Sequence, residues 1–334
     1  MRLADGWMIF LLLAFTMYIV LDGYDFGIGV LTLIDRDDGR RRAMYELVAM
    51  SWDGNESWLV LLGLALWGGL PLASGVVLPS LYIPMLLVLW SLIWRGVALE
   101  LISQYPGWHP RWGPAFGVAS LIAAFCQGAA FGGLIAGVRV HDGAFAGGPF
   151  SFFHHGYAIL TGVTATVLYV LAATAWVYLK SDGELQRRVA RIGRGATVAL
   201  GLTTAACWLL LPVAGSTTLS LTTTARLVVW LIGAVVLAGG LAMAYRSFGG
   251  RSGLAVVSAT LAVYAGGLML LLGLIYPRVV PPSITVYQAA SPTSTLVFLL
   301  VGVGMFVPVV LTYQVFAYWV FRGKVSIKQE TTSE

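Results

Sequence analysis

Long apolar segments follow one another along almost the whole chain, and this pattern restricts the fold more than any other feature. Nine segments each hold about the 20 apolar residues that a helix needs to cross the hydrocarbon core of a bilayer. Hydrophobic residues make up 58% of the 334 residues and charged ones only 10%, which is typical of polytopic membrane proteins. We therefore expect an all-α protein with nine transmembrane helices, at residues 7–34, 47–73, 77–102, 113–138, 156–180, 195–214, 225–245, 253–275 and 294–320.

The basic residues between these segments predict the orientation of the chain. If the segments cross the membrane in turn, sixteen of the 20 Lys and Arg residues fall on one side, and only Arg2, Arg139, Arg226 and Arg278 on the other. An excess of Lys and Arg marks the cytoplasmic side. We predict an outside N-terminus and a cytoplasmic C-terminus in a bacterial inner membrane. The net charge of +5 is then a topology signal and not a nucleic-acid surface.

Ionisable side chains occur at membrane depth in the first three segments. A charged carboxylate inside a bilayer is costly and usually faces a bundle interior or a water path. At 1.5 Å per residue, Asp25 lies roughly 15 Å from the inner boundary. All of these side chains fall in the inner half of the membrane: Asp22, Asp25, Asp53, Glu56, Arg95 and Glu100.

The spacing of these acids indicates a function. Asp22 and Asp25 share a helix face, as do Asp53 and Glu56, and carboxylates in such surroundings can exchange protons near neutral pH. We assign Asp25 and Asp53 to a cytoplasmic proton path, with Asp22 and Glu56 in secondary roles. An alternative for Asp22 is bonding to backbone amides near its flanking glycines.

Arg95 indicates a second, structural role within the same cluster. Buried arginine–acid pairs often only hold helices together, and we assign Arg95 and Glu100 to such ion pairing, with Asp53 as the alternative partner of Arg95. One arginine cannot neutralise five acids, however. We therefore expect the remaining carboxylates to form a proton path in addition to this ion pairing.

The histidines and cysteines show no pattern that would ligate a redox metal. Haem iron generally binds His, Met or Cys within a bundle, whereas all four histidines fall in or beside loops. Cys126 and Cys207 show neither metal-ligand spacing nor a disulfide framework. We expect this chain to ligate no metal. The four histidines are His109, His141, His154 and His155.

Several stretches resemble signature blocks of subunit II of the cytochrome bd-type quinol oxidases. They are "LDGYDFGIGVL", "SWDGNESWLVLLG", "LYIPMLLVLWSLIWRGVALEL", "WGPAFGVASLIAAFCQGAAFGG" and "FAYWVFRGKV". The five blocks occur in order over nearly the whole chain, and "RGVALE" is most similar to the cyanide-insensitive branch. The resemblance implies one integral membrane domain, with a first four-helix bundle in 1–139, a second in 156–275, a peripheral ninth helix at 294–320 and a cytoplasmic tail at 321–334.

The resemblance also implies a function within a complex. Family members pair with a larger subunit I, which carries haem b and haem d, or b-type haem only, and the quinol site. The complex oxidises quinol and reduces dioxygen to water without pumping protons. Subunit II stabilises subunit I and helps to line a cytoplasmic proton route. A small single-helix accessory subunit and a structural quinone or lipid are further partners that the resemblance suggests.

The family's motif aspartates can be matched to single positions of this sequence. Its "DGFD"-type aspartate matches Asp25, with Asp22 as companion, and its "WDGN" aspartate matches Asp53. The chain departs from the family at Gln288, where an acid is common, so a role for that acid on the outer side does not carry over.

Two other functions compete with the oxidase subunit. A proton- or cation-coupled transporter often has helices broken near mid-membrane, and "WDGNES" could form such a break. The acids cluster towards one side, however, and the second half has no matching acidic motif. A purely structural scaffold would explain the lack of cofactor ligands and should tolerate Asp→Asn at the buried acids.

Overall fold

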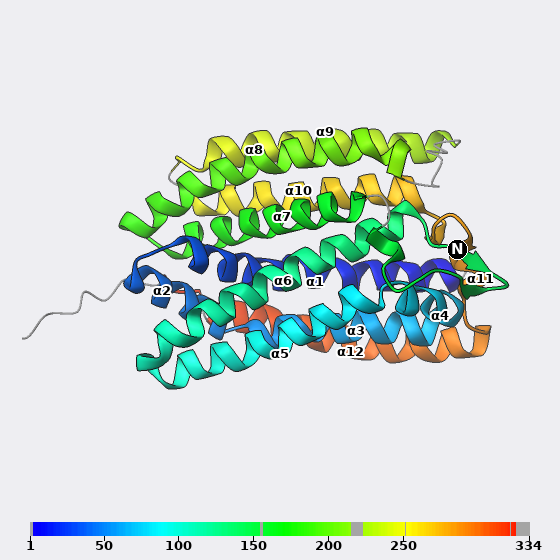
Figure 1. The fold of residues 1–334 in the computed structure, drawn as a ribbon, viewed down its shortest axis with the longest axis horizontal. Coiled ribbons are helices and arrows are strands. Elements are labelled where there is room, and N and C mark those ends of the chain that lie inside the picture. Colours follow the sequence, from blue (N-terminus) through cyan, green and yellow to red (C-terminus); the bar gives the residue numbers. More distant parts are fainter. Residues whose placement is uncertain (1–2, 154–155, 215–222, 251, 321, 325–334) are drawn as a thin grey trace, which may run out of the picture.

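The protein is a long bundle of roughly parallel and antiparallel helices (Figure 1). A computed structural model describes residues 3–153, 156–214, 223–250, 252–320 and 322–324. The helices are α1 (Leu3–Ile34), α2 (Asp38–Ala49), α3 (Trp52–Gly69), α4 (Pro71–Ser80), α5 (Tyr82–Gln104), α6 (His109–Ala136), α7 (Tyr157–Lys180), α8 (Gly183–Ala214), α9 (Thr224–Ser247), α10 (Gly253–Ile275), α11 (Val286–Ala289) and α12 (Thr293–Val320).

Eight helices in the described ranges are long and apolar enough to cross a membrane: α1, α5, α6, α7, α8, α9, α10 and α12. The prediction of an all-helical, multi-pass membrane protein is therefore confirmed. The count of nine crossings and the orientation of the chain stay predictions.

The second predicted crossing, 47–73, is not one helix. The chain ends α2 at Ala49, starts α3 at Trp52 and breaks again at Leu70, just before Pro71. A residue before proline is disfavoured in the helical conformation, and the φ and ψ of Leu70, −130° and 60°, are not helical. Apolar residues alone could not reveal this break, because they continue through it.

The third predicted crossing, 77–102, is interrupted as well. Helix α4 ends at Ser80, and α5 starts at Tyr82 and continues to Gln104. Pro84, in the first turn of α5, has no N–H to donate to the carbonyl of Ser80. The turn between the two helices therefore lies at Leu81.

Two basic stretches that we expected to be loops are helical. The arginine-rich segment after α1 forms α2, whose N-cap Asp37 accepts a 2.8 Å hydrogen bond from the backbone N–H of Arg40. This short helix buries Met44, Leu47 and Val48 against the bundle. Likewise α8 begins at Gly183, twelve residues before the predicted start, because its arginines and glutamate are compatible with a helix.

The first helix lies at the centre of the arrangement. In Figure 1, α3, α5 and α12 lie on one side of α1 and α6, while α7, α10, α8 and α9 lie on the other. A close approach between α1 and α7 requires glycine: a Cβ atom at Gly27 would overlap the backbone carbonyl of Tyr169. The two groups of helices therefore pack directly against each other beside the acids of α1.

Short hairpins close the end of the bundle opposite α2. Strands β1 (Val140–His141) and β2 (Ala144–Phe145) pair antiparallel, as do β3 (Arg278–Val280) and β4 (Ile284–Thr285). A short 3₁₀ turn lies near these hairpins at Ser151–Phe153, and another lies at the α2 end, at Pro106–Trp108 between α5 and α6. Gln288, the position where an acid was expected from the resemblance, caps α11: its Oε1 accepts a 2.9 Å hydrogen bond from the N–H of Thr285.

Candidate functional site: a buried acid cluster

Three of the first helices meet at one arginine. Arg95 of α5 is only 1% exposed, and its Nη2 donates to Asp22 Oδ1 of α1 at 2.7 Å and to Glu56 Oε1 of α3. Asp22 is fully buried, whereas Glu56 keeps 23% of its side chain exposed. The guanidinium also lies 4.3 Å from the ring centroid of Phe26. A single cation thus balances two carboxylates of different accessibility.

The other buried aspartate of α1 binds a different partner. Asp25 is fully buried, and its Oδ2 accepts a 2.8 Å hydrogen bond from Nδ2 of Asn55. Asn55 follows Asp53 on α3 and is itself fully buried. The adjacent acids of α1 therefore have separate surroundings, one with an ionic partner and one with a neutral amide.

A network of hydroxyl and amide groups continues from Asn55 to the last helix. Asn55 Oδ1 accepts hydrogen bonds from Gln314 Nε2 at 2.7 Å and from the Tyr318 hydroxyl at 3.1 Å. The Tyr318 hydroxyl also lies 2.8 Å from that of Tyr24, which in turn lies 2.7 Å from Ser51 Oγ. The acid cluster is thereby joined to α12 as well as to α3 and α5.

Several atoms of the cluster are buried without a protein hydrogen-bond partner. They are Asp22 Oδ2, Asp25 Oδ1, Arg95 Nε and Arg95 Nη1. An unsatisfied buried polar group costs about 1–3 kcal/mol, and more when charged, so each such group calls for an explanation in ordered water or in proton exchange. The two carboxylate oxygens can accept a proton or a water molecule, and the two arginine nitrogens can donate to water.

Asp53 does not join this cluster. It lies in the first turn of α3 with its side chain exposed, and its Oδ1 accepts a 2.8 Å hydrogen bond from the N–H of Gly54. Helix α3 starts only at Trp52, so Asp53 precedes the part of α3 that packs against α1. Its companion Glu56, one turn later, does reach Arg95.

The expected pairing of Arg95 with Glu100 does not occur. Five positions along a helix correspond to a rotation of about 500°, which places the two side chains roughly 140° apart. Glu100 is exposed and accepts a hydrogen bond from Gln104, one turn further along α5. The partners of Arg95 are Asp22 and Glu56 instead.

The sequence analysis missed the neutral members of the site. Asn55 stands inside the quoted "WDGNES" motif, and Gln314 is a polar residue in a strongly apolar segment; both facts could have singled them out. Tyr24 and Tyr318 gave no such signal, since tyrosines are common near the ends of membrane helices.

A second ionic network lies near the start of α2. Arg40 donates from Nε and Nη2 to the buried carboxylate of Asp35 at distances of 2.8–3.1 Å, and from Nη1 to Glu184 of α8 at 2.7 Å. Burial raises the pKa of Asp35, but hydrogen bonds from Arg40 and from the N–H of Asp37, together with the charges of Arg40 and Arg188, outweigh it and hold the pKa below its ordinary value. This network ties the end of α1 to α8.

Metal ligands do not gather anywhere in the described part of the chain. No group of three or more His, Cys, Asp or Glu side chains there could hold a metal ion. His109 opens α6 and His141 belongs to the β1 hairpin, while His154 and His155 lie outside the described residues. Cys126 and Cys207 are buried free thiols.

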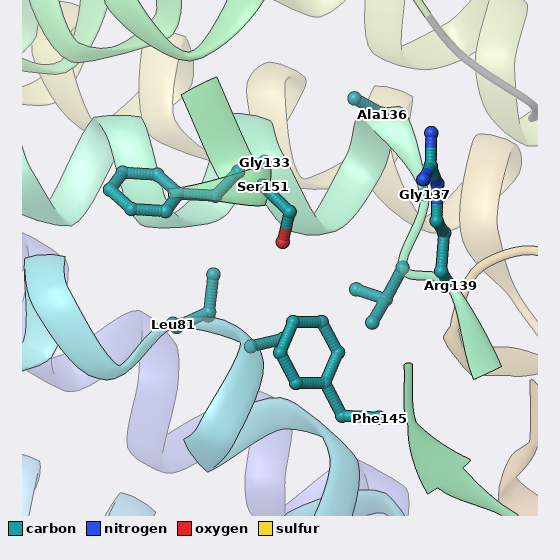
Figure 2. Close-up of a pocket in the computed structure, with 10 residues that line it drawn as sticks. Leu81, Gly133, Ala136, Gly137, Arg139, Phe145 and Ser151 are labelled. Carbon is teal, nitrogen blue, oxygen red and sulfur yellow. The ribbon is translucent and has the colours of Figure 1, made fainter. Parts of the chain in front are cut away.

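A small pocket near the hairpin end lies away from the acids. It is lined by residues of α4, α6 and the segment after α6, and Figure 2 shows Leu81 and Phe145 facing each other across it with the Ser151 hydroxyl directed inward. Charged acceptors are missing from this lining, so the acid cluster is the better candidate for a functional site.

The fold and the site define a class: a multi-pass helical membrane protein that buries carboxylates against an arginine among its first helices. Residues 3–321 match the family model of cytochrome bd terminal oxidase subunit II. The chain belongs to this family, and it is thus a subunit of a bd-type quinol oxidase, an oxidoreductase complex of respiratory electron transport. The resemblance seen in the sequence is confirmed.

Individual relatives agree with this placement. The chain is 28% identical over 342 residues to cytochrome bd ubiquinol oxidase subunit 2 of Bacillus subtilis (strain 168), covering 99% of both. It is 28% identical over 200 residues to cytochrome bd-I ubiquinol oxidase subunit 2 of Escherichia coli (strain K12), covering 58% of this chain and 52% of the relative. The fold is similar to that of the bd oxidase from Geobacillus thermodenitrificans, with a TM-score of 0.76, 14% identity and coverage of 96% and 99%.

Proposed function

We propose that this subunit stabilises the larger haem-bearing subunit of the oxidase and lines a proton path from the cytoplasm towards the site of oxygen reduction. Oxygen reduction consumes protons and electrons, and the haems that supply the electron chemistry would be held by subunit I. The observation that carries the proposal is the pair of fully buried acids, Asp22 and Asp25, each with one carboxylate oxygen that no group in the described part of the chain satisfies.

The accessibility of the acids gives the path a direction. Asp53 is exposed at the start of α3, Glu56 is partly exposed one turn later, and Asp22 and Asp25 are buried. The predicted topology places this start of α3 towards the cytoplasm. A proton would pass from Asp53 or Glu56 to Asp22 beside Arg95, and then to Asp25 on the same helix face.

Arg95 has a defined part in this path. Its charge lowers the free energy of a buried carboxylate, so it allows one of the two acids that it contacts to be ionised while the other carries a proton. Because both acids contact Nη2, a proton can move between them with little rearrangement of the arginine. Glu100, which is exposed and bonded to Gln104, has no part.

The decisive experiment compares Asp25→Asn and Asp22→Asn with Glu100→Gln in the purified oxidase. We expect both aspartate variants to assemble with normal haem content and to slow quinol-dependent oxygen uptake by about tenfold or more, which corresponds to about 1.4 kcal/mol in the barrier. Glu100→Gln should retain full activity. If both aspartate variants assemble and their turnover is unchanged, the proton path is wrong. Only the role of this subunit in stabilising subunit I then remains.

A further inference from the structure

A glutamine of the outermost helix is directed inward, to the acid cluster. Helix α12 exposes most of its large apolar side chains, whereas Gln314 is only 5% exposed. A side-chain amide in a bilayer is costly unless hydrogen-bonded, so its position depends on its partner. That partner is Asn55, whose Oδ1 accepts from Gln314 Nε2 at 2.7 Å.

Several contacts fix which way the Asn55 amide faces. Gln314 and Tyr318 both donate to Asn55 Oδ1, and the NH₂ group also donates to the backbone carbonyl oxygen of Leu21 at 3.2 Å, an atom that can only accept. The NH₂ group is therefore directed to α1. There it donates to Asp25 Oδ2 at 2.8 Å.

We propose that Gln314 is a positioning residue for Asp25, acting through Asn55, with Tyr318 as its support. The inference rests on the proposed function of Asp25 in proton conduction. The amide holds Oδ2 in one orientation and leaves Oδ1, which has no protein partner, as the oxygen that exchanges a proton. Without Gln314 the Asn55 oxygen loses one of its two donors, so the amide is held less firmly and Asp25 Oδ2 loses its fixed orientation.

A simpler role for Gln314 would be to fasten α12 to the bundle. In that case its loss should lower the stability of the complex and leave the chemistry at Asp25 unchanged. The test therefore needs a measurement that reports on the Asp25 carboxyl group itself. The C=O stretch of its protonated form is such a signal, since it moves to higher frequency when the carbonyl oxygen loses a hydrogen bond.

The experiment uses the complete oxidase with Gln314→Met, which keeps the size of the side chain and removes its donor. Tyr313→Phe is the matched control, because Tyr313 lies on the exposed side of the same helix. Oxygen uptake is measured at varied quinol concentration, and infrared difference spectra are recorded between oxidised and reduced enzyme. The Asp25 band is identified by its loss in Asp25→Asn.

We expect Gln314→Met to lower kcat roughly fivefold, in line with the loss of one hydrogen bond of the network that holds the Asp25 carboxyl group, with an unchanged KM for quinol and an upward shift of the Asp25 band. Tyr313→Phe should change neither kcat nor the Asp25 band. Should Gln314→Met fail to assemble, Tyr318→Phe removes one of the two donors to Asn55 without removing bulk, and a smaller change of the same kind is expected.

The outcomes separate this inference from the proposed function. If Asp25→Asn is inactive while Gln314→Met or Tyr318→Phe has normal kcat and an unmoved band, the positioning role is wrong and the proton path stands. If Asp25→Asn is fully active, the proton path itself is wrong, and Gln314 serves only to attach α12.

Discussion

Asp22 and Arg95 form a buried ion pair of 2.7 Å although 73 positions separate them in the chain. The pair joins α1 to α5, and Glu56 of α3 contacts the same Nη2 atom. Because a buried charge that loses its partner is far more costly than a pair that was never formed, these residues should act as a unit in stability as well as in catalysis.

Replacing Arg95 alone should be worse than replacing both members of this pair. Arg95→Met leaves the buried Asp22 without its cation, and we expect a loss of about 3–5 kcal/mol in the stability of the complex. The double variant Arg95→Met, Asp22→Leu should recover more than about 1 kcal/mol of that loss. Thermal unfolding of the purified complexes measures both, and strictly additive effects would contradict the coupling.

Asp53→Asn should have a much smaller effect than Asp25→Asn. Asp53 is exposed on the first turn of α3, where water and Glu56 can replace it as a proton acceptor, whereas Asp25 is fully buried. We expect less than about a threefold loss of oxygen uptake, equivalent to roughly 0.7 kcal/mol. Steady-state rates over a range of buffer concentrations check this. Equal losses in the two variants would mean that Asp53 is an essential step of the path and not one of two alternative entry residues.

The network at Asp35 predicts a dependence of stability on pH. Because its pKa is held below the ordinary value in the folded protein, Asp35 stabilises the fold fully above the pKa of the unfolded chain, and this contribution is lost as the pH falls through the folded value, below about pH 4.

Asp35→Asn should therefore destabilise the complex at pH 7 by about 1–3 kcal/mol, and the difference from the unmodified protein should shrink towards pH 3. Asp38→Asn is the control, because Asp38 is exposed and pairs only with Arg41 among the described residues. Thermal unfolding across this pH range distinguishes the two. A difference that persists unchanged at pH 3 would mean that Asp35 acts through packing and not through charge.

A methyl group at Gly27 should disrupt the contact between α1 and α7. The added Cβ would overlap the Tyr169 carbonyl, and overpacking of this kind typically costs about 1–3 kcal/mol or more. Gly63→Ala on α3 is the control, since open space surrounds that position and alanine favours a helix. The yield of assembled oxidase and its melting temperature should fall for Gly27→Ala only.

The sequence predicted most of the fold because apolar length is a direct requirement of the bilayer. It predicted seven of the long helices within a few residues of their ends, from 7–34 to 294–320. It failed where polar and apolar signals conflict: α2 and the start of α8 are basic yet helical, and Pro71 interrupts a segment that is apolar on both sides.

The candidate site was partly predictable for a similar reason. Charged residues at membrane depth are rare, so Asp22, Asp25, Glu56 and Arg95 could be singled out one by one. Which of these residues contact one another depends on the side of each helix that they occupy. For this reason Glu100 and Asp53 lie apart from the cluster. Asn55 and Gln314 are neutral and need three-dimensional packing to be recognised.

The contact between Tyr24 and Tyr318 spans 294 positions of the chain, and this has a consequence for biosynthesis. The residues of α12 that complete the surroundings of Asp25 leave the ribosome long after α1 has done so. A chain that stops before α12 leaves Asn55 Oδ1 without both of its donors. The site is therefore complete only after α12 has been synthesised, and a product truncated before α12 lacks it.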